Sequence, residues 1–351
     1  MVAMPAQPAD ALTVVTAASA ASVSPSPIRT VQVVLPSSPP HDPEHLVDGV
    51  AWLRNIGIDC WVTESLEPGP LPHLAGHDRH RAETLLDALD RPGIDAVWCG
   101  RGGSGALRTL MAADAMALLG GGSHDKTPDV MPHGRSTPVW SGRRWPGRPL
   151  IGLSDATALL TWRALRLKCA AIHGPVITQL PKLDSDSAEV VARWLRRPAV
   201  LPELRCEMPP RVAGTAEGVL IGGNLTLLAA CLGTPEAPVL SGSILLVEEI
   251  GEPAYRIDRM FSQLQRAGAL RGIVGVACGT FSDCPAPHLV AACLDDWAQR
   301  LGVPWAGPFP VGHTGACQPV AIGARYRLDA NKGLLQPIGA QHDSERAHAS
   351  A

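Results

Sequence analysis

The chain has 351 residues, of which 46% are hydrophobic and 18% charged, and its formal net charge at pH 7 is -3. This length and apolar content predict two domains, while the slightly negative charge and the lack of a Lys/Arg-rich run argue against binding to a nucleic acid polymer. No apolar run is long enough to span a membrane, and the nine cysteines are scattered, without the spacing of a zinc site.

Residues 1–29 form a nearly uncharged segment rich in Ala, Ser, Pro and Val. The segment lacks the basic start and the continuous apolar core of a secretory signal, since Pro5, Pro8 and Asp10 lie at its beginning. We expect a disordered leader. Together with the unpaired cysteines, this favours a reducing, cytoplasmic location.

Strands and helices are predicted to alternate from residue 30 onward. The strands are expected at 30–35, 58–62, 94–99 and 148–153, and the helices at 45–53, 79–89 and 156–165. Such alternation is typical of a parallel sheet with helices on both faces. Residues 30–185 are therefore predicted to form an N-terminal, Rossmann-like α/β domain.

A glycine-rich loop, Gly100 to Gly105, directly follows the strand at 94–99. Ligands bind at the carboxyl ends of strands in such sheets, and glycines let backbone N–H groups approach an anion or an oxyanion. A phosphate site is disfavoured, because the spacing matches neither nucleotide-binding motif and no lysine is near. A plain connecting loop is the alternative.

Residues 119–147 are predicted to be an inserted loop. The stretch is rich in Gly, Pro, His, Ser and Arg and includes Trp140 and Trp145. Loops of this length are usually functional lids or disordered segments. His124 and His133 lie too far apart in sequence to suggest a metal site.

Ser154 ends a short buried strand and precedes a predicted helix. Small residues, Gly152 and Ala156, lie two positions before and two positions after it, as in a nucleophile elbow, where a tight turn exposes a serine hydroxyl. The helix start would add N–H groups and a positive dipole end that favour a developing oxyanion. The alternative is an ordinary N-cap serine.

The second half of the chain is predicted to be a smaller, β-rich α/β domain at 203–337, joined to the first by residues 186–202. The strands are expected at 218–224, 243–248, 272–278 and 319–322, and the helices at 225–232 and 255–267. In the second helix Ile257, Met260, Phe261 and Leu264 share one face. Residues 338–351 are expected to be a flexible tail.

A serine nucleophile needs a base, and the base needs an acid that orients it. Of the twelve histidines, His173 and His313 lie in apolar or turn surroundings, and each could also be purely structural. Glu248 ends an apolar strand, where a carboxylate is expected to have a partner, although it could reach solvent. Cys317, four residues after His313, is a weaker candidate for a reactive thiol.

Taken together, these segments resemble the LD-carboxypeptidase family of serine peptidases, which includes the microcin-immunity peptidases. The similar stretches span about residues 30 to 330 in family order. They are Pro36-Ser37-Ser38-Pro39, Arg101-Gly102-Gly103-x-Gly105, Ile151-Gly152-Leu153-Ser154-Asp155-Ala156-Thr157-Ala158-Leu159, His173-Gly174-Pro175, Gly222-Gly223-Asn224-Leu225, Gly233-Thr234-Pro235, Leu246-Val247-Glu248, Tyr255-Arg256-Ile257-Asp258-Arg259 and Gly312-His313.

The resemblance implies a catalytic triad in a cleft between the two domains. Ser154 would be the nucleophile, His313 the base and Glu248 the acid. The backbone N–H groups of Gly103 and Asp155 would form the oxyanion hole. Substrate binding is further implied for Arg101, Gly102, Ser104 and Asn224.

The resemblance also implies the reaction. A cytoplasmic homodimer without metal or cofactor would release terminal D-Ala from L-Lys or meso-diaminopimelate in murein tetrapeptides, during peptidoglycan recycling. An immunity-type peptidase that cleaves amides beside a nucleotide, with the insertion tryptophans stacking on the base, is an alternative. A third is a non-catalytic ligand-binding module on the same fold.

Three features depart from the family pattern. Ser104 replaces an aromatic residue, Glu249 replaces an aspartate, and the insertion at 119–147 is longer than expected. These departures bear on substrate specificity more than on the chemistry.

Overall fold

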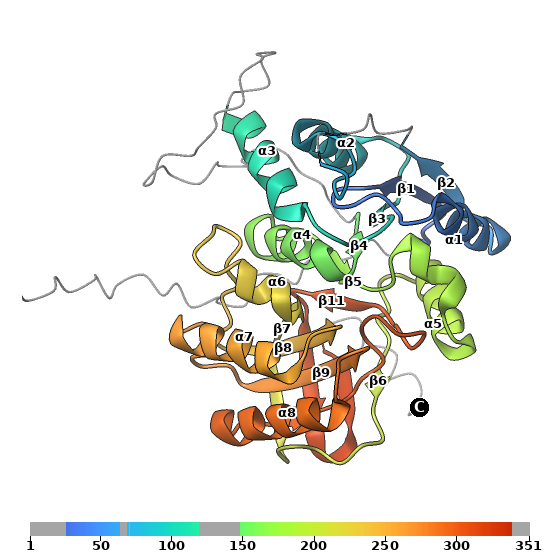
Figure 1. Cartoon of the computed structure of the whole chain (residues 1–351). Helices are drawn as coiled ribbons and strands as arrows, with labels where there is room; N and C mark the ends of the chain where they lie inside the picture. Colours follow the sequence, from blue (N-terminus) through green and yellow to red (C-terminus); the bar gives the residue numbers. More distant parts are fainter. Residues whose placement is uncertain (1–25, 64–68, 70, 119–147, 339–351) are drawn as a thin grey trace, which may run out of the picture.

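The computed structural model describes residues 26–63, 69, 71–118 and 148–338, and these form two β-sheets with helices packed around them (Figure 1). In the described residues the first sheet has six strands in the order β11-β5-β4-β3-β1-β2. They are β1 (Thr30–Val34), β2 (Asp59–Val62), β3 (Ala96–Cys99), β4 (Leu150–Gly152), β5 (Ala171–His173) and β11 (Val320–Ile322). Neighbouring strands are parallel except β11, which runs antiparallel to β5. The predicted α/β class with a parallel N-terminal sheet is confirmed.

Helices cover both faces of the first sheet because successive strand side chains point to opposite faces. The helical segments of this half are α1 (Pro43–Asn55), α2 (Asp78–Asp90), α3 (Ala106–Leu118), η1 (Ser154–Ala156), α4 (Thr157–Thr161), η2 (Trp162–Arg166), η3 (Ile177–Lys182) and α5 (Ser185–Arg196). Val33 and Trp98 pack in one core cluster with residues of α1 and α5. Val34 and Cys99 pack in another with residues of α2, α3 and α4.

The second sheet has seven strands within the described part of the chain, in the order β10-β9-β8-β7-β12-β13-β6. They are β6 (Leu204–Arg205), β7 (Thr215–Asn224), β8 (Ser243–Ile250), β9 (Gly275–Ser282), β10 (Trp305–Ala306), β12 (Arg325–Asp329) and β13 (Leu334–Pro337), and β12 and β13 are joined by η4 (Ala330–Lys332). The strands β7 to β10 pair in parallel and the others antiparallel. The second half is thus β-rich, as predicted.

In the part of the chain that the structure describes, three helices accompany the second sheet: α6 (Leu225–Ala230), α7 (Ala254–Arg266) and α8 (Pro287–Leu301). The amphipathic pattern predicted for α7 is present, since Ile257, Phe261 and Leu264 are buried in one core cluster and Met260 packs against it. Leucine and phenylalanine side chains buried at helical spacing fix which face of α7 meets the sheet.

Side-chain caps set the beginnings of two helices in the first half. The carboxylate of Asp42 accepts a hydrogen bond from the N–H of Glu44 at 2.9 Å, and Pro43 occupies the first turn of α1. The carboxylate of Asp184 caps α5 in the same way, through the N–H of Ser187 at 2.7 Å. Such caps satisfy N–H groups that have no partner inside the helix.

The structure contains elements that the pattern along the chain did not predict, and it places one predicted strand in the other sheet. The helix α5 occupies most of the stretch 186–202 predicted to join the domains, and its Val191 and Trp194 are buried in the core of the first sheet. The strand β11, expected in the C-terminal domain, belongs to the first sheet. The helix α8 was not anticipated.

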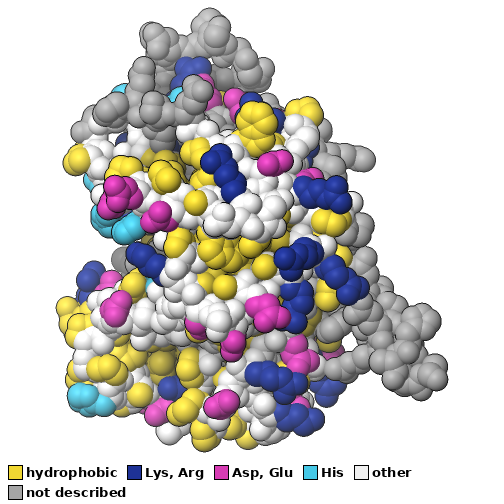
Figure 2. Space-filling model, turned by 90° about the vertical axis from the view of Figure 1, so that its right-hand side faces the viewer, with side chains coloured by type: hydrophobic (Ala, Val, Ile, Leu, Met, Phe, Trp, Pro, Cys, Tyr) yellow, Lys and Arg dark blue, Asp and Glu magenta, His cyan; other side chains and the backbone are white. Residues whose placement is uncertain are grey.

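Several predicted segments fall wholly or mostly outside the described residues. The insertion 119–147 lies outside them, as do all but residues 26–29 of the leader and all but residue 338 of the tail, and their assignments stay predictions. Among the described residues, no helix combines the length and the apolar character that crossing a bilayer requires. Figure 2 shows the side of the molecule where α1 and α5 lie, with Lys and Arg side chains interspersed with Asp and Glu.

Gly222 offers a test of how closely β7 approaches β8. Its φ is +146°, and a Cβ there would lie 1.9 Å from the carbonyl oxygen of Leu246. We expect Gly222→Ala to lower the free energy of unfolding by about 3 kcal/mol or more, because strain adds to a backbone clash.

Gly242→Ala is the matched control for this substitution. Gly242 also has a positive φ, +74°, but a Cβ there meets nothing within 4 Å, so we expect a loss of about 1 kcal/mol. Urea unfolding followed by circular dichroism measures both variants. Equal losses would contradict the close approach of the strands.

Candidate active site

Ser154 lies at a strained turn between β4 and a helical segment. Its φ of +65° is in the left-handed region, which few residues other than glycine adopt. The small neighbours are needed, since a Cβ at Gly152 would lie 2.6 Å from the Cβ of Ala156. The helix expected at 156–165 is split into the short α4 and a π-helical turn, η2. The turn has the form of a nucleophile elbow.

The glycine-rich loop after β3 lies directly against this turn. A Cβ at Gly102 would lie 2.7 Å from the Cβ and 3.1 Å from the Oγ of Ser154. Gly103 has a φ of +106°. Among the described residues, no acceptor takes a hydrogen bond from the backbone N–H of Gly103 or of Asp155. Both groups are therefore available to an oxyanion beside Ser154.

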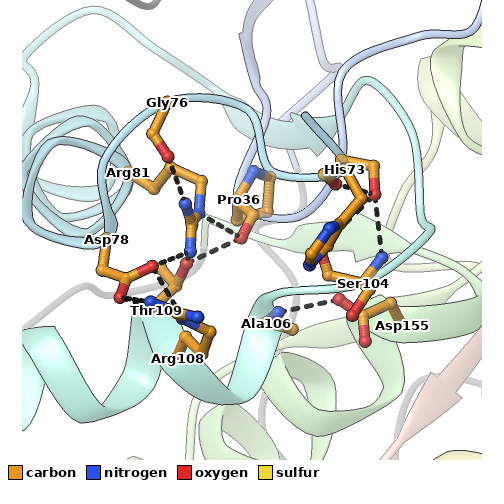
Figure 3. A network of polar contacts seen from close by, with 11 residues as sticks. Pro36, His73, Gly76, Asp78, Arg81, Ser104, Ala106, Arg108, Thr109 and Asp155 are labelled. Atoms are coloured by element: carbon orange, nitrogen blue, oxygen red, sulfur yellow. Dashed lines mark hydrogen bonds and ion pairs between the residues drawn. The ribbon is translucent and has the colours of Figure 1, made fainter. Parts of the chain in front are cut away.

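The side chain of Asp155 ties the Ser154 turn to the glycine-rich loop. Its Oδ2 accepts a hydrogen bond of 2.7 Å from the N–H of Ala106, the first residue of α3 (Figure 3). Burial raises the pKa of this carboxyl despite that bond. The loop is also held by Ser38, whose Oγ accepts from the N–H of Ser104 at 3.0 Å and donates to the carbonyl of His73 at 2.6 Å.

Arg81 on α2 stabilises the segments next to the glycine-rich loop. Its buried guanidinium donates to Thr109 Oγ1 at 3.0 Å, to the carbonyl of Gly76 at 2.6 Å and to Asp78 at 2.6 Å (Figure 3). It also donates to the carbonyl of Pro36, at the start of the loop that follows β1, at 3.3 Å. One cation therefore joins that loop to α2 and α3.

Glu248 and His313 meet on the second sheet. Glu248, fully buried, is in β8, and its Oε2 lies 2.7 Å from Nδ1 of His313, which lies in the loop between β10 and β11. A carboxylate only accepts hydrogen bonds, so Nδ1 carries the proton and Nε2 of neutral His313 has a free lone pair. Gln179 holds this loop by donating to the carbonyls of Gly312 at 3.1 Å and Thr314 at 2.9 Å.

The pair has shifted pKa values. Burial by itself would raise the pKa of Glu248, but its contacts with His173 and His313 outweigh burial and lower the pKa to about 2. Burial would lower the pKa of His313, but the hydrogen bond and charge of Glu248, with the charges of Glu249 and Asp283, outweigh burial and raise that pKa above 6.5. Glu248 is therefore an anion that stabilises protonated His313.

Asn224, at the end of β7, links the second sheet to α4 beside the pair. Its N–H donates to Thr157 Oγ1 at 3.0 Å, its amide donates to Glu249 Oε1 at 2.8 Å, and its Oδ1 accepts from the N–H of Leu227 at 3.2 Å. Glu249 also accepts two bonds of 2.8 Å from Thr226. The side chain of Glu249 therefore holds α6 to β7 and β8.

Other candidate residues are placed as follows. The guanidinium of Arg101 donates to the carbonyl of Pro39 at 2.5 Å and contacts His41. Cys317 is buried, which raises the pKa of its thiol to about 12 and makes it an unreactive neutral group. No hydrogen bond joins Ser154 to His313 among the residues that the structure describes. In those residues, no three His, Cys, Asp or Glu side chains are grouped to hold a metal.

Comparison with known proteins assigns the chain to a family. The model for the LD-carboxypeptidase N-terminal domain matches residues 31–174, and the model for the LD-carboxypeptidase C-terminal domain matches residues 217–328. The chain belongs to the LD-carboxypeptidase family. Its site therefore lies in the fold of a carboxypeptidase, and the predicted resemblance is confirmed.

Individual members of the family are similar along most of this chain. The murein tetrapeptide carboxypeptidase of Pseudomonas aeruginosa is 33% identical over 299 residues, which are 80% of this chain and 88% of that protein. The solved muramoyltetrapeptide carboxypeptidase from Oxalobacter formigenes has a TM-score of 0.69 at 25% identity and covers 87% of this chain and 98% of its own. MccF in complex with glutamyl sulfamoyl guanosine has a TM-score of 0.70 at 17% identity, over 91% of this chain and 99% of its own, which shows the shared fold alone.

The coupling of Glu248 and His313 is testable in this protein without a substrate. Glu248→Gln keeps the shape of the side chain and removes its charge, so we expect the pKa of His313 to fall, because burial then acts with less opposition. Titration of the imidazole nitrogens by NMR measures the shift. Glu217→Gln, at a half-exposed position of β7, is the control and should leave the pKa of His313 where it is. A pKa of His313 that does not move in Glu248→Gln would contradict the coupling.

Proposed function

We propose that this member of the LD-carboxypeptidase family is a serine hydrolase that releases the terminal D-Ala of murein tetrapeptides from L-Lys or meso-diaminopimelate. The observation that carries the proposal is the buried Glu248–His313 pair, which lies on the second sheet while the strained Ser154 turn lies on the first. The 33% identity to the Pseudomonas aeruginosa murein tetrapeptide carboxypeptidase supports the substrate class. Recycling of murein peptides in the cytoplasm by a homodimer is part of the same proposal.

In the proposed first step, the Oγ of Ser154 attacks the carbonyl carbon of the scissile amide, and Nε2 of His313 takes the hydroxyl proton. The Ser154–His313 contact forms with substrate bound, because catalytic hydrogen bonds are often long in a free enzyme. Glu248 stabilises the imidazolium that results. The N–H groups of Gly103 and Asp155 donate hydrogen bonds to the carbonyl oxygen and stabilise the negative charge that develops on it.

In the second step the C–N bond breaks. Protonated His313 returns its proton to the leaving amine of D-Ala, and the acyl group stays on Ser154 as an ester. Water then attacks this ester with His313 again as the base, which releases the shortened peptide and restores the Ser154 hydroxyl. The two steps together consume one water molecule and involve no change of oxidation state. Arg101, Gly102, Ser104 and Asn224 are proposed to contact the peptide.

The test is D-Ala release from a purified murein tetrapeptide by wild type and Ser154→Ala. We expect wild type to release D-Ala and the variant to be slower by about 10⁴-fold or more, because the nucleophile is lost. Ser241→Ala, at an exposed turn, should keep the wild-type rate. A tetrapeptide that ends in L-Ala should not be cleaved.

Two results would overturn parts of this proposal. Equal release by wild type and Ser154→Ala would mean that Ser154 is only a turn residue. Release by neither protein would exclude the murein substrate, and glutamyl or aspartyl sulfamoyl nucleosides would then be tested as substrates of the same triad. Light scattering after gel filtration tests the proposed homodimer, and a mass of one chain would exclude it.

A further inference from the structure

His173 is a buried titratable side chain that the proposed mechanism does not use. It ends β5, where it pairs with Gly152 of β4 on one side and Val320 of β11 on the other. Its exposed fraction is 0%. Among the described residues, neither of its ring nitrogens has a hydrogen-bond partner. Such a group is costly to bury unless a charge or a polar partner compensates it.

The polar atom near His173 is the second oxygen of Glu248. Nε2 of His173 lies 3.8 Å from Oε1 of Glu248, and both side chains are fully buried. At this distance the contact is electrostatic rather than a hydrogen bond, and burial strengthens it. Oε2 of the same carboxylate lies 2.7 Å from His313. The carboxylate of Glu248 is therefore placed between two imidazoles, one from β5 of the first sheet and one from the loop between β10 and β11.

The surrounding backbone confines this arrangement. A Cβ at Gly279 would lie 3.0 Å from the Cβ of Glu248, and one at Gly312 would lie 3.2 Å from its Oε2. A Cβ at Gly223 would lie 3.2 Å from Cδ2 of His173. Glycines on three segments thus allow close packing around the two side chains, which leaves each little freedom to turn.

We infer that His173 is a positioning residue, which holds Oε1 of Glu248 so that Oε2 stays directed at Nδ1 of His313. This inference rests on the proposed function, because it assigns His313 the role of base. The remaining groups that act on His313 are Glu249 of β8 and Asp283 after β9. Cys317, near Glu248, is neutral because burial raises the pKa of its thiol to about 12. None of these three residues lies on β5, so a replacement of His173 leaves their positions in the chain untouched.

A comparison of His173→Gln with His173→Asn tests the inference. The amide nitrogen of Gln lies about where Nε2 of histidine lies, whereas that of Asn lies near Nδ1, so only Gln can reach Oε1 of Glu248. We expect His173→Asn to lower kcat by about 10- to 100-fold, the usual loss for a group that orients another. KM should change little, and His173→Gln should recover most of the rate.

The pH dependence gives a second readout. Without the contact from His173, Oε2 of Glu248 is no longer held toward Nδ1 of His313, so the carboxylate stabilises the imidazolium less. The pKa of His313 and the acid limb of kcat/KM should therefore both move to lower pH in His173→Asn. The pKa of His313 is measured by NMR and needs no turnover, so it tests the inference even if the murein substrate is wrong.

Val320→Ala is the matched control, since Val320 is the buried neighbour of His173 on β11. It should lower stability without moving the acid limb. If the Gln and Asn variants lose rate equally, or if the pKa of His313 is the same in His173→Asn and wild type, the inference is wrong. Both replacements are polar and no larger than histidine, so we expect the variants to fold. If His173→Asn does not fold, His173→Gln still tests the inference, because its acid limb of kcat/KM should lie at the wild-type pH.

Discussion

The buried negative charge of Glu248 is the constraint on which the rest of this site depends. An isolated carboxylate at 0% exposure would bind a proton rather than stay ionised. It remains an anion because imidazoles approach it from two parts of the fold. The strand β8 supplies the charge, and β5 and the loop before β11 supply the partners. The positions of the two sheets relative to each other therefore determine the electrostatics of the site.

The site also requires that the backbone of the glycine-rich loop comes close to the turn at Ser154. Ser154 adopts a left-handed conformation against Gly102, where any side chain would collide with it. That strain costs of the order of 1–3 kcal/mol and persists only where the surroundings hold the turn in place. Here the turn is held by the hydrogen bond from α3 to the carboxylate of Asp155. The guanidinium of Arg81, which joins three neighbouring segments, holds the same part of the fold. Hydrogen bonds thus maintain a serine in a conformation that its own backbone disfavours.

Much of this architecture could be predicted from local patterns, and some could not. The turn at Ser154 follows from Gly152 and Ala156, and Glu248 is conspicuous as a carboxylate at the end of an apolar strand. His313, by contrast, shared its apolar or turn surroundings with His173 among twelve histidines, and only the family resemblance chose it over His173 as the base. The place of β11 depends on pairing with residues about 150 positions away, which leaves no periodic signal. The contact of His173 with Glu248 joins two sheets and is hidden for the same reason.

The crossing of β11 into the first sheet has a consequence for synthesis on the ribosome. The first sheet gains its last strand only when residues 320–322 have been translated, after five of the seven strands of the second sheet. Until then the nascent N-terminal half has β5 as an unpaired edge, a template for pairing with other chains. The strand that closes this edge also fixes one end of the loop that carries His313. The growing chain therefore becomes protected from aggregation and gains its base in the same late event.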